Sequence, residues 1–192
     1  MRIFLSASVP KVGRGSFYEN ADPFLIQVAV RELVTTIVRH CTLVWGGHPS
    51  ITPMIWAVCE DLGVRYAERV RLYQSLLFQA DFPEENVQFD NVVHVPPVGH
   101  DVPASLAQMR HRMLTDTRFD AAVFIGGMEG IFAEYDLVCE HQPQAHRIIL
   151  TAPGGAAQQL GEGCPKGNAL VSSTVDFAEL FDHLFPAPGP RM

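Results

Sequence analysis

Two glycine pairs are the segments of this 192-residue chain best suited to bind a ligand. Gly46-Gly47 and Gly126-Gly127 each end a short apolar run and precede a stretch with helical character. Glycine lets the backbone turn tightly and approach a ligand closely, because it has no β-carbon. A helix that begins beyond such a turn presents unpaired N–H groups and a partial positive charge, which favour phosphate. The two turns predict a nucleotide-like ligand held between two loops.

Glu134 and Arg110 are the candidate catalytic residues. Glu134 lies one helical turn after Gly130, and helical side chains lean back toward the N-terminus, so its carboxylate is expected over the second glycine loop. There it could accept hydrogen bonds from ribose hydroxyls or act as a general base, or it could be a surface acid that stabilises the helix start. Arg110 flanks an apolar stripe and could clamp phosphate, pair with Glu134 or face solvent.

Further side chains near strand ends extend the predicted site. His48 follows the first glycine pair and could donate to phosphate or a base, with an ordinary loop histidine as the alternative. Ser50 is equally suited to capping a helix. Thr151 and Gly154 belong to a third strand-end turn, which either forms a wall of the pocket or simply ends the sheet. The sequence has no P-loop, no G-x-G-x-x-G after the first strand and no G-x-S-x-G motif.

Strand and helix patterns alternate along the chain. We predict strands at 2–7, 41–45, 92–95, 121–125 and 147–151, helices at 23–38, 52–62, 103–114, 129–140 and 176–184, and a strand or strand plus turn at 69–78. This order predicts one α/β domain over residues 1–185, with a doubly wound, Rossmann-like parallel sheet covered by helices on both faces. Residues 186–192 are expected to form a flexible tail. Ligands of such sheets bind beyond the carboxyl ends of the strands, where the strand order switches.

The composition argues against several functions. A net charge of −7 argues against nonspecific binding of nucleic acid, which requires a basic surface. No apolar run approaches the roughly 20 residues needed to cross a bilayer, and the N-terminus does not resemble a signal peptide. Four scattered cysteines without a C-x-x-C pair indicate reduced thiols in the cytoplasm. Because ligating residues are not clustered, we expect no metal and no other cofactor.

The second glycine pair belongs to a longer motif. Residues 125–134, I-G-G-M-E-G-I-F-A-E, resemble the P-G-G-x-G-T-x-x-E motif of the LOG ("lonely guy") family. Arg110 lies on a segment similar to the arginine-bearing helix that precedes this motif in the family. Gly46-Gly47 falls where the family has an earlier glycine loop, and residues 6–8 fall at its small-residue loop after the first strand. Because the similarities span residues 1–155 in order, the chain is identified as a member of the SLOG superfamily (SMF/DprA–LOG) of Rossmann-like nucleotide-binding domains.

The resemblance implies a ligand site built from several loops. Backbone groups of the glycines would approach phosphate, Ser6 and Ser8 would add hydroxyl donors, Arg110 would clamp phosphate and Glu134 would contact ribose. The expected ligand-binding set is Ser6, Ala7, Ser8, Gly46, Gly47, His48, Ser50, Gly126, Gly127, Met128, Glu129, Gly130, Thr151 and Gly154.

The resemblance leaves the activity open between three functions. Some SLOG domains bind nucleotides related to NAD or ADP-ribose and act as sensors, whereas LOG enzymes hydrolyse the N-glycosidic bond of nucleoside monophosphates. The third alternative is a protein-interaction module with a vestigial pocket. Ile125 and Ile131 replace the proline and threonine of the LOG motif, and the lost hydroxyl argues more against hydrolysis than against nucleotide binding. The family also implies a homodimer.

Overall fold

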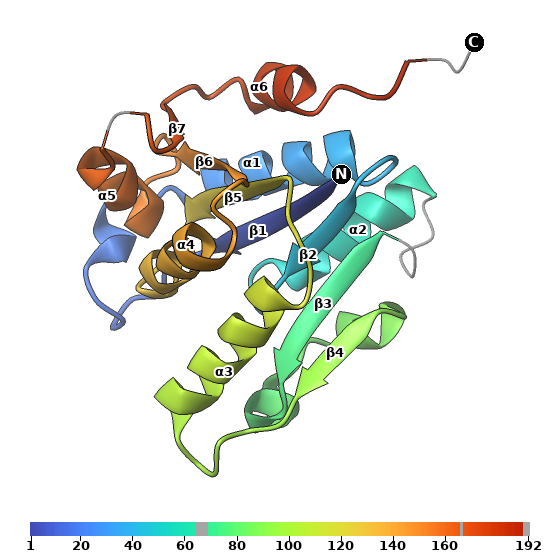
Figure 1. Cartoon of the computed structure of the whole chain (residues 1–192), viewed down its shortest axis with the longest axis vertical. Coiled ribbons are helices and arrows are strands. Elements are labelled where there is room, and N and C mark those ends of the chain that lie inside the picture. Colours follow the sequence, from blue (N-terminus) through green and yellow to red (C-terminus); the bar gives the residue numbers. More distant parts are fainter. Residues whose placement is uncertain (64–68, 166, 190–192) are drawn as a thin grey trace.

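The computed structural model describes residues 1–63, 69–165 and 167–189. They contain one sheet of seven parallel strands in the order β4-β3-β2-β1-β5-β6-β7 (Figure 1). The strands are β1 (Arg2–Ser8), β2 (Thr42–Trp45), β3 (Val70–Ser75), β4 (Val92–Val95), β5 (Ala121–Gly126), β6 (His146–Leu150) and β7 (Leu170–Ser172).

Helices cover both faces of the sheet. The first face carries α1 (Pro23–Ile37), α2 (Thr52–Leu62) and α6 (Phe177–Leu184), and the second carries α3 (Val102–Thr115), α4 (Gly130–His141) and α5 (Gly155–Gly163). Each face has its own apolar core, because successive strand residues point to opposite sides. In β1, Ile3 and Leu5 lie in the first core and Phe4 in the second. Within the described residues, three 3-10 segments lie in the connections: η1 (Phe17–Glu19), η3 (Leu76–Asp81) and η4 (Glu84–Gln88).

The helix boundaries follow from local chemistry. The Asp22 carboxylate accepts hydrogen bonds from two amides of the first turn of α1 at 2.9 and 3.1 Å, and Pro23 supplies the first helical residue. Asp101 caps α3 in the same way at 2.9 Å. Gly63 ends α2 with φ +65°, a left-handed conformation that glycine adopts without a steric penalty.

The strand order switches direction at β1. Going outward from β1, strands β2, β3 and β4 lie on one side, and β5, β6 and β7 lie on the other. The loops that follow β1 and β5 therefore lead to helices on opposite faces. In doubly wound sheets, the crevice outside the carboxyl ends of two such strands is where ligands bind. Ser8 pairs with Gly126 at this edge. The switch point thus lies at the second glycine pair, between the small-residue end of β1 and the start of α4.

The predicted fold class is confirmed: the chain forms one parallel, doubly wound sheet with helices on both faces. The segment predicted as a strand or strand plus turn at 69–78 contains β3 followed by η3. Helix α5 and strand β7 were not predicted. In the expected tail at 186–192, residues 186–189 have no regular secondary structure, and 190–192 lie outside the described residues. No helix in the described ranges is both long and apolar enough to span a bilayer.

Candidate functional site

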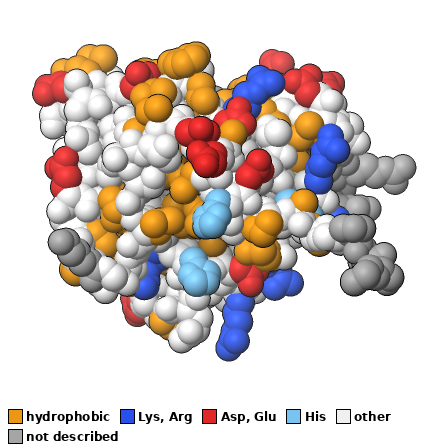
Figure 2. Space-filling model, turned by 90° about the horizontal axis from the view of Figure 1, so that it is seen from above, with side chains coloured by type: hydrophobic (Ala, Val, Ile, Leu, Met, Phe, Trp, Pro, Cys, Tyr) orange, Lys and Arg blue, Asp and Glu red, His pale blue; other side chains and the backbone are white. Residues whose placement is uncertain are grey.

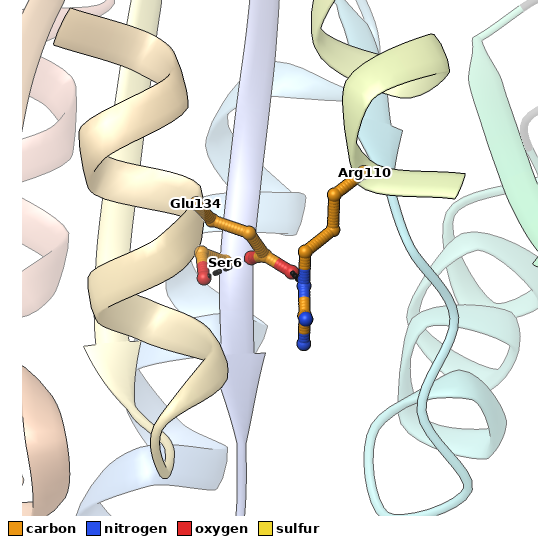
Figure 3. A network of polar contacts seen from close by, with 3 residues as sticks. All are labelled: Ser6, Arg110 and Glu134. Carbon is orange, nitrogen blue, oxygen red and sulfur yellow. Dashed lines mark hydrogen bonds and ion pairs between the residues drawn. The ribbon is translucent and has the colours of Figure 1, made fainter. Parts of the chain in front are cut away.

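A hydrogen-bonded contact joins three elements at the candidate site (Figure 3). Glu134 of α4 accepts one hydrogen bond through each carboxylate oxygen. The Ser6 hydroxyl of β1 donates to Oε2, and Arg110 Nε of α3 donates to Oε1 at 3.1 Å. The Arg110 and Glu134 side chains are 20% and 14% exposed, so this ion pair is screened by water less than a surface pair. The carboxylate is therefore held in one orientation by residues far apart in the sequence.

The Arg110 guanidinium lies against the first residue of α4. A β-carbon at Gly130 would be 2.7 Å from Arg110 Nη2, so a larger residue there would displace the end of the arginine side chain. Of the three guanidinium nitrogens of Arg110, only Nε donates to Glu134. Its Nη1 and Nη2 donate to no side chain or carbonyl in the described ranges. These nitrogens are available to an anionic ligand at the start of the helix.

The first turn of α4 presents backbone donors at the same place. The N–H groups of Met128, Glu129 and Gly130 have no acceptor among the residues that the structure describes, while the N–H groups of Ile131 and Phe132 bond to carbonyls within the turn at 2.9 and 3.2 Å. Unclaimed N–H groups at the positive end of a 12-residue helix attract anions. Together with the arginine, they form a site suited to phosphate.

The second glycine pair brings this helix end close to β1. Gly126 and Gly127 adopt φ values of +61° and +76°, and the Gly127 N–H donates to the Ser8 carbonyl at 2.8 Å. A β-carbon on Gly126 would lie 2.5 Å from Ile26, and one on Gly127 would lie 2.3 Å from Ile131. The chain's own packing therefore requires both glycines, whether or not a ligand is bound.

The end of β1 contributes two serines on the α4 side of the sheet. Ser6 and Ser8 lie on the same face as Phe4, whereas Ala7 packs against the core under α1 and α2. Ser8 is 9% exposed, and its hydroxyl has no hydrogen-bond partner within the described part of the chain. The structure thus brings Ser6 and Ser8 to the crevice, but it turns the side chain of Ala7 away.

The first glycine pair leads to a helix end closed by its own groups. Gly47, with φ +62°, packs against Gln74: a β-carbon there would lie 1.9 Å from Gln74 Nε2. The His48 carbonyl accepts the N–H groups of Ile51 and Thr52, both at 2.9 Å. The neighbouring residues Pro49 and Pro53 have no N–H. Gly46, which lies against methionines of α3, and Gly47 therefore serve packing in this structure.

His48 and Ser50 bond mainly to each other and to Val9, the residue that follows β1. His48 Nδ1 accepts from the Ser50 amide at 3.2 Å and contacts the Ser50 hydroxyl at 2.7 Å, and Ser50 Oγ accepts the Val9 N–H at 3.1 Å. Burial, followed by the charges of Lys11 and Arg14, lowers the pKa of His48 to about 4. The ring is neutral near pH 7, with its proton on Nε2 while Nδ1 accepts.

The third predicted turn ends against the second glycine pair: a β-carbon on Gly155 would lie 2.9 Å from the Gly126 carbonyl carbon, and the Ala156 N–H donates to the Gly127 carbonyl at 3.0 Å. The Thr151 hydroxyl donates to the Ser172 carbonyl at 3.1 Å, and Thr151 lines a separate surface cavity of about 490 Å³ with Gln158 and Glu162. Gly154 is buried beneath Asn20, where a β-carbon would lie 1.8 Å from the backbone oxygen. Thr151 and Gly154 are thus held by contacts within the protein, and the turn reaches the second glycine pair through Gly155.

Two cations that the sequence analysis did not single out lie near the site. Lys11 and Arg14 follow β1, and their charges act on His48. Neither side chain forms an ion pair within the described ranges. The signal in the sequence was the position of two basic residues in a glycine-containing loop directly after the first strand.

A second cavity, of about 460 Å³, lies at the opposite edge of the sheet. Its lining includes His146, Arg147 and His183. Figure 2 shows the molecule from the side of α6, where histidine side chains lie among apolar and acidic ones. This edge lacks the convergence of helix amides and arginine found at α4. Within the described residues, no group of three or more His, Cys, Asp or Glu side chains could hold a metal ion.

The fold is that of a Rossmann-like domain, and the α4 amides and Arg110 lie at its switch point. The sequence profile of the SLOG cluster3 family matches residues 16–185, and the chain belongs to this family. The X-ray structure of TM1055, a structural genomics target, is similar with a TM-score of 0.58 and 14% identity, over 95% of this chain and 98% of that chain. At this identity the similarity shows the fold alone. No curated protein matches the chain.

Proposed function

We propose that this chain binds a nucleotide or nucleotide-sugar at the carboxyl ends of β1 and β5. The observation that carries the proposal is the convergence of three unclaimed backbone N–H groups, at residues 128–130, with the free nitrogens of Arg110. Backbone N–H groups at a helix start, combined with a guanidinium, bind phosphate oxygens well. Membership of the SLOG family supports a nucleotide as the source of that phosphate.

The two carboxylates at the crevice suit the sugar rather than the phosphate. Glu134 is fixed by Ser6 and Arg110, and Glu129 is exposed at the start of α4. Carboxylate oxygens accept hydrogen bonds from hydroxyl groups and repel phosphate. Ribose would therefore lie on the Glu134 side, with the phosphate at the N–H groups of α4.

Binding without turnover, as in a sensor, agrees best with the contacts of Glu134. Both of its oxygens accept hydrogen bonds from the protein, so general-base catalysis would require one of these contacts to break. Hydrolysis of an N-glycosidic bond is the second candidate, because a fixed and mostly buried carboxylate would stabilise a cationic sugar transition state.

A binding experiment with matched ligands tests the proposal. Isothermal titration and thermal shift with AMP, ADP, ADP-ribose and NAD are compared with adenosine, which lacks phosphate. The phosphorylated compounds should raise the melting temperature, because a ligand that binds only the folded state stabilises it. Adenosine should bind far more weakly. Absence of binding by every phosphorylated compound would refute the proposal and favour the interaction module with a vestigial pocket.

Chromatography of the same mixtures separates binding from hydrolysis. Under the sensor function, the nucleotide is recovered intact. Under the hydrolase function, free base accumulates, and Glu134→Gln should stop its release while keeping binding, because the amide can still contact Ser6 and Arg110. Release of base at an unchanged rate in this variant would exclude Glu134 as the catalytic residue.

The proposed assembly is a homodimer, and its support is the family resemblance. Light scattering coupled to size-exclusion chromatography would measure the mass against the 21.2 kDa of one chain. A monomer at all concentrations would contradict the dimer without affecting the ligand proposal.

A further inference from the structure

Two of the four cysteines meet at one tyrosine hydroxyl on the second face of the sheet. Tyr135 and Cys139 are one helical turn apart on α4, and Cys164 follows the last residue of α5, the helix beside α4 (Figure 1). The Tyr135 hydroxyl oxygen lies 3.3 Å from Cys164 Sγ. Burial, followed by the hydrogen bond to Cys164 and the charge and hydrogen bond of Cys139, raises the pKa of Tyr135. Because one hydroxyl bonds to both sulfurs, the two thiols lie near each other although they come from different helices.

Cys139 has the surroundings of an attacking thiol. It is exposed, and Arg147 Nη1 of β6 donates to its sulfur at 3.8 Å. Arg147 Nε donates to the Asn168 carbonyl at 2.7 Å, which holds the guanidinium in place. A guanidinium beside an accessible sulfur attracts the thiolate, and the thiolate is the form that reacts with oxidants.

Cys164 has the surroundings of a second thiol that reacts later. It is half-buried against the second core, and its sulfur donates to the Pro165 carbonyl at 3.7 Å. That bond uses the S–H proton, so the Tyr135 hydroxyl is the donor in its own contact with Cys164. Partial burial slows direct oxidation of Cys164 by solvent oxidants, and its nearness to Cys139 leaves it the neighbouring thiol as a target.

The other two cysteines have neither feature. Cys41 and Cys59 are buried in the first core, under the helices of the opposite face. Burial also raises the pKa of the Cys41 thiol. Buried thiols in apolar surroundings are inert, so these two residues serve as internal controls for the reactivity of Cys139.

We propose that Cys139 and Cys164 form a reversible disulfide when the protein meets a peroxide. The Cys139 thiolate attacks one peroxide oxygen, the O–O bond breaks, and the products are Cys139 sulfenic acid and, after protonation, an alcohol or water. The Cys164 sulfur then attacks Cys139 Sγ, the S–S bond forms, and the departing hydroxide takes up the Cys164 proton as water. The Tyr135 hydroxyl, which bonds to both sulfurs, can carry that proton. The two thiols lose two electrons in total, and these reduce one peroxide.

Peptide mapping after treatment with hydrogen peroxide tests for the disulfide. Trypsin cleaves after Arg118, Arg147 and Lys166, which places the two cysteines on the separate peptides 119–147 and 148–166. Mass spectrometry of the oxidised wild type should find these peptides joined, and reduction should release them. The oxidised monomer should also melt at a higher temperature than the reduced one, because the bond constrains the unfolded chain. Peptides that stay unlinked, or a link to Cys41, to Cys59 or between two chains, would refute the pair.

Single cysteine variants test the order of the two steps. In Cys164→Ser, hydrogen peroxide should convert Cys139 to a sulfenic acid that persists and is trapped by dimedone. Cys139→Ser should form neither the dimedone adduct nor the disulfide. A dimedone adduct on Cys164 in Cys139→Ser, formed as fast as the one on Cys139, would contradict the assignment of Cys139 as the attacking thiol.

Arg147 is the positioning residue of this pair, and its charge can be tested separately. In the Cys164→Ser background, Arg147→Met should slow formation of the dimedone adduct about fivefold or more, because the cation beside the sulfur is lost. Arg147→Lys keeps a positive charge and should recover part of the rate. The matched control is Arg39→Met, which removes an exposed arginine on the other face of the sheet and should leave the rate unchanged. Equal rates in Arg147→Met and Arg39→Met would refute the role of the guanidinium.

Discussion

The loops at Gly46-Gly47 and Gly126-Gly127 look alike in sequence and differ in what they leave unpaired. Both end a buried parallel strand, and both contain glycine at positive φ. At the start of α2, the His48 carbonyl and ring accept the amides of Ser50, Ile51 and Thr52, and the two neighbouring prolines have no N–H. At the start of α4, three successive amides have no acceptor among the described residues. At the residues where the two helices begin, 50–52 and 128–130, only those of α4 present free amides to an anion.

This difference shows that a glycine pair at a strand end can be required for packing alone, and that it does not by itself indicate a ligand site. In both loops a β-carbon would collide with a neighbouring side chain, Gln74 in one case and Ile26 or Ile131 in the other. The tight turn is thus explained without a ligand. What distinguishes a binding loop is the set of donors left over after the protein has satisfied its own groups.

Removal of the Arg110 guanidinium, which lies at the start of α4, should cause the largest loss of nucleotide affinity. Arg110→Met should weaken nucleotide binding about 100-fold, because a charge-assisted contact to phosphate is lost. Isothermal titration measures the change. Arg112→Met on the same helix is the control, since Arg112 pairs with Asp116 at 3.5 Å and should leave the affinity unchanged. Equal losses in the two variants would refute a specific role for Arg110.

Adding a methyl group to the α2 loop should affect folding rather than binding. Gly47→Ala should lower the free energy of unfolding by about 2 kcal/mol or more, because alanine must adopt positive φ and meets Gln74 and Leu72. Urea denaturation measures this loss. The folded fraction should bind nucleotide with wild-type affinity. Gly163→Ala, where a β-carbon meets nothing within 4 Å, is the control. A large loss of nucleotide affinity in Gly47→Ala would instead indicate that the loop at Gly46-Gly47 contacts the ligand.

Acidification should destabilise the α2 loop through His48. The pKa of His48 is about 4 in the folded protein, below its ordinary value of 6.5, and burial is the main cause. Between these values the unfolded state binds more protons, so the free energy of unfolding falls as the pH drops from 6.5 to 4. We expect His48 to contribute about 1–2 kcal/mol to this fall, less than the full shift because the ring is partly exposed. His48→Asn, which cannot titrate, should flatten the profile by that amount in chemical denaturation. An unchanged profile would contradict a half-buried, neutral His48 ring.

The smallest expected effect tests the position of Arg110. Gly130→Ala should weaken nucleotide binding about fivefold, because the new methyl group displaces the guanidinium from the start of α4. Stability should change little, since alanine favours the helix and only a flexible side chain must move. In the Arg110→Met background, Gly130→Ala should have no further effect on affinity. Additive losses would show that Gly130 acts by another route.

Much of the fold was predictable because its signals are local. The apolar stripe of α1 and its Asp22-Pro23 start define that helix, and the continuous apolar run of β5 is typical of a strand buried on both faces. Helix α5 was missed because its glycines have low helix propensity and its helical state depends on packing: Ala156 and Ala157 are fully buried against the sheet. Strand β7 has only three residues and pairs at the sheet edge, which leaves almost no pattern to detect.

The candidate site was predictable in its residues, and pairing of Arg110 with Glu134 was one of the alternatives, but the contact with Ser6 was not foreseen. The motif indicated Glu134 and the preceding helix indicated Arg110, and the structure brings them together with Ser6. Lys11 and Arg14 were passed over because a polar loop has no periodicity that fixes its course. The sequence did not indicate that His48 Nδ1 accepts the Ser50 N–H, which leaves Nε2 as the ring nitrogen that can donate.

The order of strands, helices and glycine turns, together with the family motif, follows from the residues alone, because hydrophobic periodicity, caps and turns act between near neighbours. The strand order that places the end of β1 beside β5 depends on pairing between distant segments. The same long-range pairing determines which N–H groups find acceptors within the protein. An amide at α2 and an amide at α4 are chemically the same, and only the folded chain determines that the first is satisfied and the second is free.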